Sequence, residues 1–382
     1  MFNARRTLEV MESLKMAPSG AFAAGPGNYS DIWLRDHLYM AFAYYYLGEP
    51  EKCVDGVRVV LNILHTQRHK LGQILKPSIH AKYRHNGNWF EEITESWGHH
   101  QGDVIGLLLY IVAYLDDREL SVVRDHGDRD LLQLLIFYVL NRKYWAEPDN
   151  GIWETCWTRK SSSIGAIVSG LAYAKRRRLA SVQDQLISLG HNELDRILPY
   201  ESRDMCGEDN GRHNREMGHD CDIAQLSLIW PFGVVSLEMG NTILSRIVDG
   251  HTTQNGIRHK LVHTHGIFRF WGDEYLSQYG GVSAEWQWDF WLAIIYAKKN
   301  DLTKAFYWFD RGVKRITPDG YIAEAYVNGV PNEHTPLGWM HALALIAWTK
   351  ILDRLGVSKD KLFTISYEIV RDRIHKSHPT SQ

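Results

Sequence analysis

The carboxyl group of Glu154 directly follows a tryptophan, in the string Asp149-Asn150-Gly151-Ile152-Trp153-Glu154. A carboxyl beside a large apolar ring loses hydration, which disfavours its charged form and raises its pKa. A carboxyl that stays protonated near neutral pH can act as a general acid, as in the hydrolysis of glycosidic bonds. The same string also suits a structural role, with Trp153 in the core and Glu154 in a surface ion pair. The string alone leaves both interpretations open.

Four further strings set charged or amide side chains beside aromatic rings. An Arg next to an Asp can donate to and accept from sugar hydroxyls, and a ring can stack on the apolar face of a sugar. At a helix start the same residues can instead cap the helix or stabilise its dipole. The strings are Tyr29-Ser30-Asp31-Ile32-Trp33-Leu34-Arg35-Asp36, Ser96-Trp97-Gly98-His99-His100-Gln101-Gly102-Asp103, Arg269-Phe270-Trp271-Gly272-Asp273, and Gly320-Tyr321-Ile322-Ala323-Glu324 followed by Pro336-Leu337-Gly338-Trp339.

The composition is typical of a soluble globular protein, with many large aromatic rings. Of 382 residues, 45% are hydrophobic and 23% are charged, and there are 14 Trp and 19 Tyr. The net charge of −2 predicts neither a nucleic-acid nor a membrane partner. No apolar signal segment and no run of about 18 apolar residues occur, so we expect a cytoplasmic protein. The 4 cysteines are too widely spaced for a disulfide framework, which favours a reducing compartment.

Helical periodicity dominates the sequence and predicts about twelve helices, mostly in pairs. Their expected ranges are 36–48, 50–67, 101–115, 129–145, 162–176, 179–196, 221–229, 233–248, 284–299, 302–315, 335–355 and 360–374. This number of paired helices indicates an all-α fold, a closed toroid of inner and outer helices. Strand-like alternation is scarce, apart from a candidate hairpin within 259–271. No linker-like segment interrupts the chain, so we expect one domain over 1–382.

Long loops carry most of the clusters of Trp and charged residues. They span 68–100, 146–161, 200–220, 250–283 and 317–334. Long ordered loops in a compact domain are usually functional. If alternate loops lie on one rim of the toroid, the clusters meet in a single pocket at that end.

Taken in order, these strings resemble the motifs of the glucoamylase family of inverting glycoside hydrolases, glycoside hydrolase family 15. The resemblance covers nearly the whole chain and implies an (α/α)6 barrel. The family's motifs fall on Trp33, Arg35 and Asp36; on Ser96, Trp97, Gly98, Gln101 and Asp103; on Ile152, Trp153 and Glu154; on Arg269 and Asp273; and on Glu324, Leu337 and Trp339. Five matches in the same order are far more specific than any one of them.

The resemblance implies that Glu154 is the general acid and Glu324 the general base. In an inverting enzyme these carboxyls stand about 6.5–9.5 Å apart to admit a water molecule, and activity has a bell-shaped pH profile, here expected on the acid side of neutral. Neither a cofactor nor a metal is expected. The residues expected to bind substrate are Trp33, Arg35, Asp36, Trp97, Gln101, Asp103, Trp153, Arg269, Trp271, Asp273 and Trp339.

One departure from the family bears on the substrate. Many fungal members have a second Glu after the acid, where this chain has Thr155. We therefore expect a short α-glucoside, isomaltose-like or a malto-oligosaccharide, with β-glucose released from its non-reducing end. A trehalase on the same scaffold is one alternative. Another is a non-catalytic glycan-binding or regulatory module like that of the phosphorylase kinase regulatory subunits, although the presence of both Glu154 and Glu324 argues against it.

One loop gathers residue types that can bind metals, namely Cys206, His213, His219 and Cys221. Their spacing matches no usual zinc pattern, and the expected chemistry needs no metal. We therefore predict that this cluster is not a metal site. The only partner expected is a small α-glucoside or oligosaccharide.

Overall fold

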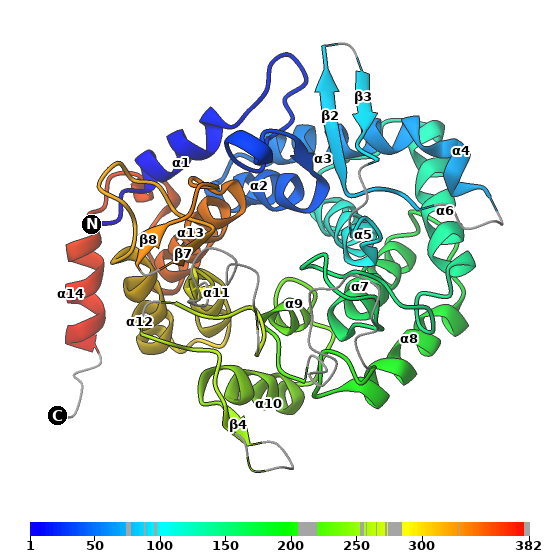
Figure 1. Ribbon diagram of the computed structural model, residues 1–382. Helices are drawn as coiled ribbons and strands as arrows, with labels where there is room; N and C mark the ends of the chain where they lie inside the picture. Colours follow the sequence, from blue (N-terminus) through cyan, green and yellow to red (C-terminus); the bar gives the residue numbers. More distant parts are fainter. Residues whose placement is uncertain are drawn as a thin grey trace.

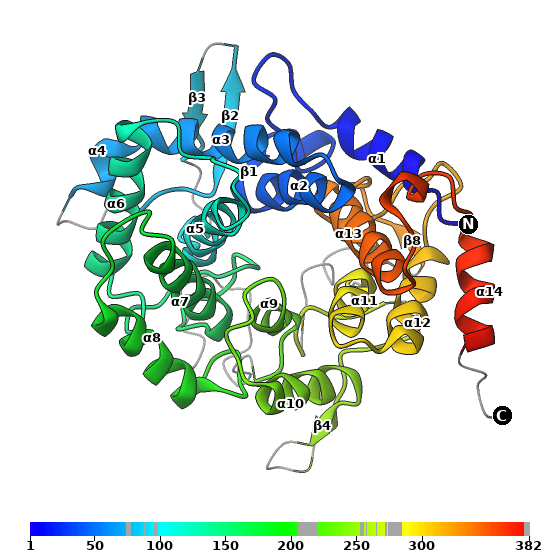
Figure 2. The ribbon, with the colours of Figure 1, turned by 180° about the vertical axis from the view of Figure 1, so that it is seen from behind.

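Helices that are buried on nearly every side form the inner layer of a ring in this computed structural model (Figures 1 and 2). An example is α2, in which every residue except Tyr45 is buried, as expected for a helix that is largely apolar beyond its first turn. The structure describes residues 1–382 except 74–77, 88, 95–97, 205–219, 253–255, 257, 265, 272, 274–284, 328 and 378–382. The inner helices are α2 (Leu34–Leu47), α5 (Gly102–Asp116), α7 (Ser161–Arg176), α9 (Leu226–Ile229), α11 (Asp289–Lys298) and α13 (Gly338–Arg354).

An outer layer of amphipathic helices covers this ring (Figure 1). In α8, for example, the buried residues are Leu186, Gly190, Glu193, Leu194 and Ile197, which recur at helical spacing on one face. The outer helices are α1 (Ala4–Ser13), α3 (Pro50–Thr66), α6 (His126–Asn141), α8 (Asp184–Ile197), α10 (Leu237–Val248) and α12 (Leu302–Val313). Two further helices, α4 (Arg68–Leu71) and α14 (Tyr367–Ser377), lie outside the pairs.

The ring is closed, because each inner helix contacts the next and α13 contacts α2. Small residues allow the closest of these approaches, between α5 and α7. A Cβ on Gly106 would come within 2.3 Å of the Ala166 carbonyl carbon, and one on Gly170 within 2.6 Å of the Gly106 oxygen. The predicted all-α toroid of paired helices is thus confirmed as an (α/α)6 barrel. That all of 1–382 is one domain remains a prediction.

Several local elements differ from the sequence-based expectation. The outer helix α1 was not expected. The inner helix predicted over 221–229 is a 3-10 turn, Ile223–Gln225, followed by the short α9. Strands are also more frequent than expected, because short rim segments pair locally although their alternation is weak. They are β1 (Ile32–Trp33), β2 (Lys82–Asn86), β3 (Trp89–Glu92), β4 (His251–Thr252), β5 (Arg258–His259), β6 (Glu285–Trp286), β7 (Ala325–Val327) and β8 (Val330–Pro331).

Within the described residues, the strands form three small antiparallel sheets, in the orders β1-β2-β3, β4-β5 and β6-β7-β8. The candidate hairpin within 259–271 is reduced to a bridge between Val262 and Ile267, which also pairs with Trp286.

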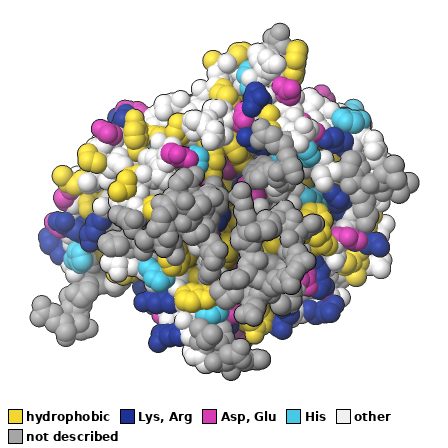
Figure 3. All heavy atoms as spheres, viewed as in Figure 1, with side chains coloured by type: hydrophobic (Ala, Val, Ile, Leu, Met, Phe, Trp, Pro, Cys, Tyr) yellow, Lys and Arg dark blue, Asp and Glu magenta, His cyan; other side chains and the backbone are white. Residues whose placement is uncertain are grey.

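The surface and the cysteines add two observations. Figure 3 shows acidic and basic side chains interspersed over the described part of one face. No helix among the described residues is both long and apolar enough to span a membrane. Cys53 and Cys221 are free and buried, whereas Cys156 is disulfide-bonded. That bond was not expected, because wide spacing along the chain says little about distance in the fold.

Candidate active site

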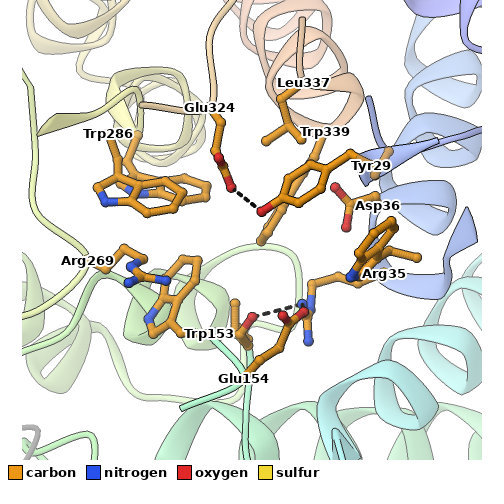
Figure 4. Close-up of a pocket in the computed structure, with 14 residues that line it drawn as sticks. Tyr29, Arg35, Asp36, Trp153, Glu154, Arg269, Trp286, Glu324, Leu337 and Trp339 are labelled. Carbon is orange, nitrogen blue, oxygen red and sulfur yellow. Dashed lines mark hydrogen bonds and ion pairs between the residues drawn. The ribbon is translucent and has the colours of Figure 1, made fainter. Parts of the chain in front are cut away.

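Side chains from both halves of the chain line one cavity of about 70 Å³ inside the ring (Figure 4). Apolar rings and a few charged groups meet there, which is the usual composition of a small-molecule site. Glu154 and Glu324 enter the cavity from opposite sides, and Arg35 and Asp36 lie on one flank between them. The lining residues are Ala24, Tyr29, Trp33, Arg35, Asp36, Ile152, Trp153, Glu154, Arg269, Trp286, Trp288, Glu324, Leu337 and Trp339.

Glu154 lies in the loop between Asp149 and Thr158, and this loop places its side chain in the cavity. The backbones of these two residues pair in an antiparallel bridge, with N–O distances of 3.0 and 3.2 Å. Inside the bridge, Glu154 has a φ of 59°, in the left-handed region. That conformation costs a non-glycine residue about 1–2 kcal/mol, so the surrounding bonds must hold it. The turn therefore fixes the direction of the Glu154 side chain at an energetic cost.

Gly98 packs directly on the backbone of Glu154. A Cβ at this position would lie 2.7 Å from the Glu154 carbonyl oxygen and 3.0 Å from its Cα. Real Cβ atoms do not approach backbone atoms so closely, so the motif requires glycine here for steric reasons.

We expect the substitution Gly98→Ala to displace Glu154 and to lower kcat by about 10²-fold, because a shift of this size misaligns a reacting group. Gly72→Ala is the matched control, since a Cβ there meets nothing within 4 Å and should leave kcat unchanged. Steady-state kinetics and the midpoint of thermal unfolding should be measured for both variants. A Gly98→Ala variant with wild-type kcat would contradict the steric role.

Arg35 connects the start of α2 to the Glu154 turn. Its Nε donates to Asp103 Oδ2 at 2.7 Å, its Nη1 donates to the Ile152 carbonyl at 2.8 Å, and its Nη2 donates to Gln101 Oε1. The Arg35 and Asp103 side chains are only 3% and 4% exposed, so the buried guanidinium has a buried counter-charge. Asp103 and Gln101 thus do not line the cavity, and they position Arg35 by accepting hydrogen bonds from it.

Burial raises the pKa of Glu154 to about 8. The nearby charge of Arg35, whose Nη1 lies 3.9 Å from Glu154 Oε1, opposes this rise, and Asp36 adds to it. With its pKa above neutrality, the carboxyl holds its proton at pH 7. This is the protonation state that a general acid needs.

Glu324 precedes β7, and two neutral donors hold its carboxylate. Tyr29 donates its hydroxyl to Oε1 at 2.8 Å, and Asn332 donates its amide to Oε2 at 2.6 Å. Burial raises the pKa of Glu324 to about 7, while these two hydrogen bonds lower it by stabilising the charged form. The two carboxyls thus have different surroundings: hydrogen bonds from neutral donors stabilise the charged form of Glu324, whereas Glu154 faces the positive charge of Arg35.

Further charged groups surround the space between the two carboxyls. Asp36 faces the cavity in Figure 4, and burial raises its pKa to about 6. Arg269 lies across from it and binds Asp273 through two hydrogen bonds of 2.8 and 2.7 Å. The Arg269 guanidinium carbon is 4.4 Å from the centre of the Trp286 ring. Charged groups and aromatic rings thus line the same cavity, which suits a polar ligand that also has apolar faces.

The structure brings most of the predicted site residues together. Eight of them line the cavity: Trp33, Arg35, Asp36, Trp153, Glu154, Arg269, Glu324 and Trp339. Gln101, Asp103 and Asp273 support those residues from behind. Trp271 instead stacks on His259, with ring centres 4.6 Å apart. Trp97, Cys206, His213 and His219 lie outside the described residues.

Four polar or aromatic residues of the site were not predicted from the sequence. Tyr29 and Asn332 bind Glu324, and Trp286 and Trp288 form part of the wall. Tyr29 begins one of the strings singled out above, and both tryptophans flank polar residues, so a signal existed for these three. Nothing in the sequence around Asn332 indicated a role in the site. Asn332 comes close to Glu324 only because β7 and β8 pair as antiparallel strands.

Comparison with known proteins agrees with this geometry. The model of glycosyl hydrolases family 15 matches residues 6–275. The chain belongs to glycosyl hydrolases family 15.

Solved structures show the same fold at low sequence identity. A wild-type glycosidase superposes with a TM-score of 0.71 at 20% identity, over 92% of this chain and 96% of that one. The glucoamylase from Saccharomycopsis fibuligera has a TM-score of 0.63 at 15% identity, over 95% and 94% of the two chains.

Curated relatives point to a second group of proteins. A probable phosphorylase b kinase regulatory subunit alpha from Drosophila melanogaster is 28% identical over 159 residues, which are 36% of this chain and 12% of the relative. Its counterpart from Caenorhabditis elegans is 24% identical over 378 residues, 84% of this chain and 30% of the relative. The chain therefore spans less than a third of the length of either.

Proposed function

We propose that this protein is an inverting, exo-acting α-glucoside hydrolase that releases β-glucose from the non-reducing end of short α-glucosides. The observation that carries the proposal is the pair Glu154 and Glu324, a partly buried and a buried carboxyl on opposite sides of one cavity, with pKa values of about 8 and 7. A glycosidase variant with a TM-score of 0.71 to this chain was solved in complex with glucose, which supports a glucosyl unit as the ligand.

In the proposed reaction, Glu154 donates its proton to the glycosidic oxygen as the bond from that oxygen to the anomeric carbon breaks. Glu324 takes a proton from a water molecule, whose oxygen attacks the anomeric carbon from the opposite face. The products are β-glucose and the free alcohol, with Glu154 ionised and Glu324 protonated. One proton transfer from Glu324 to Glu154 through solvent restores the starting state. We predict about 6.5–9.5 Å between the two carboxyl groups.

The remaining groups fit supporting roles in this reaction. Asp36 and Arg269 would bind hydroxyls of the glucosyl unit, and the rings of Trp153 and Trp339 would cover its apolar surfaces. The guanidinium N–H groups of Arg35 already donate to Asp103, Gln101 and the Ile152 carbonyl. We therefore propose that Arg35 mainly orients the Glu154 turn.

A panel of α-linked disaccharides tests the proposal. Maltose, isomaltose, nigerose, kojibiose and trehalose should be supplied separately, and the anomer of the released glucose followed by NMR. Initial β-glucose establishes inversion, and the relative rates establish the linkage. Preference for trehalose would establish the trehalase alternative. Initial α-glucose from every substrate would contradict inversion.

The pH dependence of kcat/KM follows from the two pKa values. Activity needs Glu324 ionised and Glu154 protonated, so we expect it to rise tenfold per pH unit up to about 7 and to fall above about 8. Burial of both groups thus moves the optimum from the acid side of neutral to pH 7–8. Initial rates between pH 4 and 10 in a constant-ionic-strength buffer measure it. Activity that keeps rising at high pH would contradict the assigned roles.

A regulatory module is the second candidate, because the curated relatives are phosphorylase b kinase regulatory subunits. Such a module would bind an oligosaccharide without cleaving it. Saturable binding of every disaccharide in the panel, with no glucose released over days at high protein concentration, would favour this candidate over the hydrolase.

A further inference from the structure

A second cluster of ligating side chains lies away from the cavity, at the hairpin of β4 and β5. His251 on β4 and His259 on β5 are direct cross-strand partners, so their side chains lie on one face of the hairpin. The third member is Asp220, which precedes the buried Cys221. One potential ligand atom from each of the three residues lies within 4.8 Å of the others.

The distances within this cluster suit a common ligand. His251 Nε2 is 2.9 Å from Asp220 Oδ2, and His259 Nδ1 is 3.6 Å from Asp220 Oδ1. The second distance is too long for a hydrogen bond. The His259 side chain is only 8% exposed, and its Nδ1 is buried without a hydrogen-bond partner among the described residues. A buried ring nitrogen without a partner is costly unless something absent from the protein chain satisfies it.

We propose that Asp220, His251 and His259 form a binding site for one divalent transition-metal ion, such as Zn²⁺. Two imidazole nitrogens and one carboxylate oxygen form a ligand set for such an ion, which can complete tetrahedral coordination with water. Ca²⁺ and Mg²⁺ prefer all-oxygen sites and would bind poorly here. Arg246 donates to the Asp220 carbonyl at 3.0 Å, and its charge opposes a cation. We therefore expect weaker binding than at a four-ligand structural zinc site.

The ion would connect the hairpin to the wall of the cavity. Asp222, two residues after Asp220, accepts a hydrogen bond of 2.7 Å from the Trp153 indole. The next residue, Ile223, donates its backbone N–H to the Arg269 carbonyl at 2.8 Å. The ring of His259 stacks on Trp271, two residues beyond Arg269. A bound ion would thus stabilise the segment that carries Arg269 without touching the reacting groups.

Zinc titration of the full chain, after chelator treatment and dialysis, tests the site. We expect the wild type to bind one equivalent of Zn²⁺ by calorimetry, to unfold at a higher temperature with the ion, and to show no comparable response to Ca²⁺. His259→Ala and Asp220→Asn should each weaken Zn²⁺ binding at least about tenfold. His263→Ala is the matched control, because His263 lies on the same segment and its Nε2 is hydrogen-bonded to the Lys260 carbonyl, outside the cluster.

Two results would overturn the proposal: a folded wild type that takes up no Zn²⁺, or a His259→Ala variant that binds it as well as the wild type does. If the variants fail to fold, Co²⁺ added to the wild type gives an independent measurement. A tetrahedral site with nitrogen and oxygen ligands gives visible absorption bands at one equivalent of Co²⁺. Unchanged absorption would count against the site. None of these readouts depends on hydrolytic activity.

Discussion

The Glu154→Gln variant should hydrolyse an unactivated α-glucoside about 10²- to 10⁴-fold more slowly than the wild type, through kcat. An amide keeps the shape of the side chain but has no proton to give to the glycosidic oxygen. The loss corresponds to about 2.7–5.4 kcal/mol of transition-state stabilisation, at 1.36 kcal/mol per factor of ten. Steady-state kinetics on the preferred disaccharide measures it.

A substrate with a good leaving group identifies the role of Glu154. Fluoride leaves α-glucosyl fluoride with little help from an acid, so Glu154→Gln should retain much more activity on this substrate than on the disaccharide. Glu147→Gln, at an exposed position on the same segment, is the control and should behave as the wild type. Equal losses on both substrates would contradict the assignment of Glu154 as the general acid.

The Glu324→Gln variant should lose about 10²- to 10⁴-fold in kcat on both substrates, because each reaction needs an activated water. Its residual activity should also lack the rise in rate up to about pH 7 that ionisation of Glu324 causes. Glu333→Gln is the control, since the Glu333 side chain is 63% exposed on the same loop. Retention of that rise in Glu324→Gln would mean that another group is the base.

Stability measurements separate loss of chemistry from loss of fold. Both carboxyls have folded-state pKa values, about 8 and about 7, above the ordinary value of 4.5. The folded protein therefore binds these protons more tightly, and the stability they contribute is lost as pH rises from about 4.5 through the folded pKa values. At pH 8 the two Gln variants, which carry no charge there, should be at least as stable as the wild type. Thermal unfolding at pH 5 and pH 8 tests this difference.

Much of the fold could be predicted from the sequence because helical periodicity is a local property. The inner helices α2 and α13 are largely apolar, and an outer helix such as α3 begins with Pro50 and follows the left-handed Gly48. The short strands were missed, since β7 and β8 have three and two residues and owe their pairing to the rim around them. A raised pKa for Glu154 could also be expected from the sequence, because Trp153 precedes it in the chain.

The sequence by itself determined the family motifs, the paired helices and the identity of the two carboxyls. Only the tertiary structure decided which side chains line the cavity and which stand behind it. Asp103 and Gln101 belong to the same motif as Gly98, yet they bind Arg35, while Gly98 packs on Glu154. Asn332 reaches Glu324, and His259 meets Asp220, only after the chain has folded back. Spacing along a chain reports local periodicity, whereas the environment that sets a pKa or forms a metal site is assembled from segments far apart in sequence.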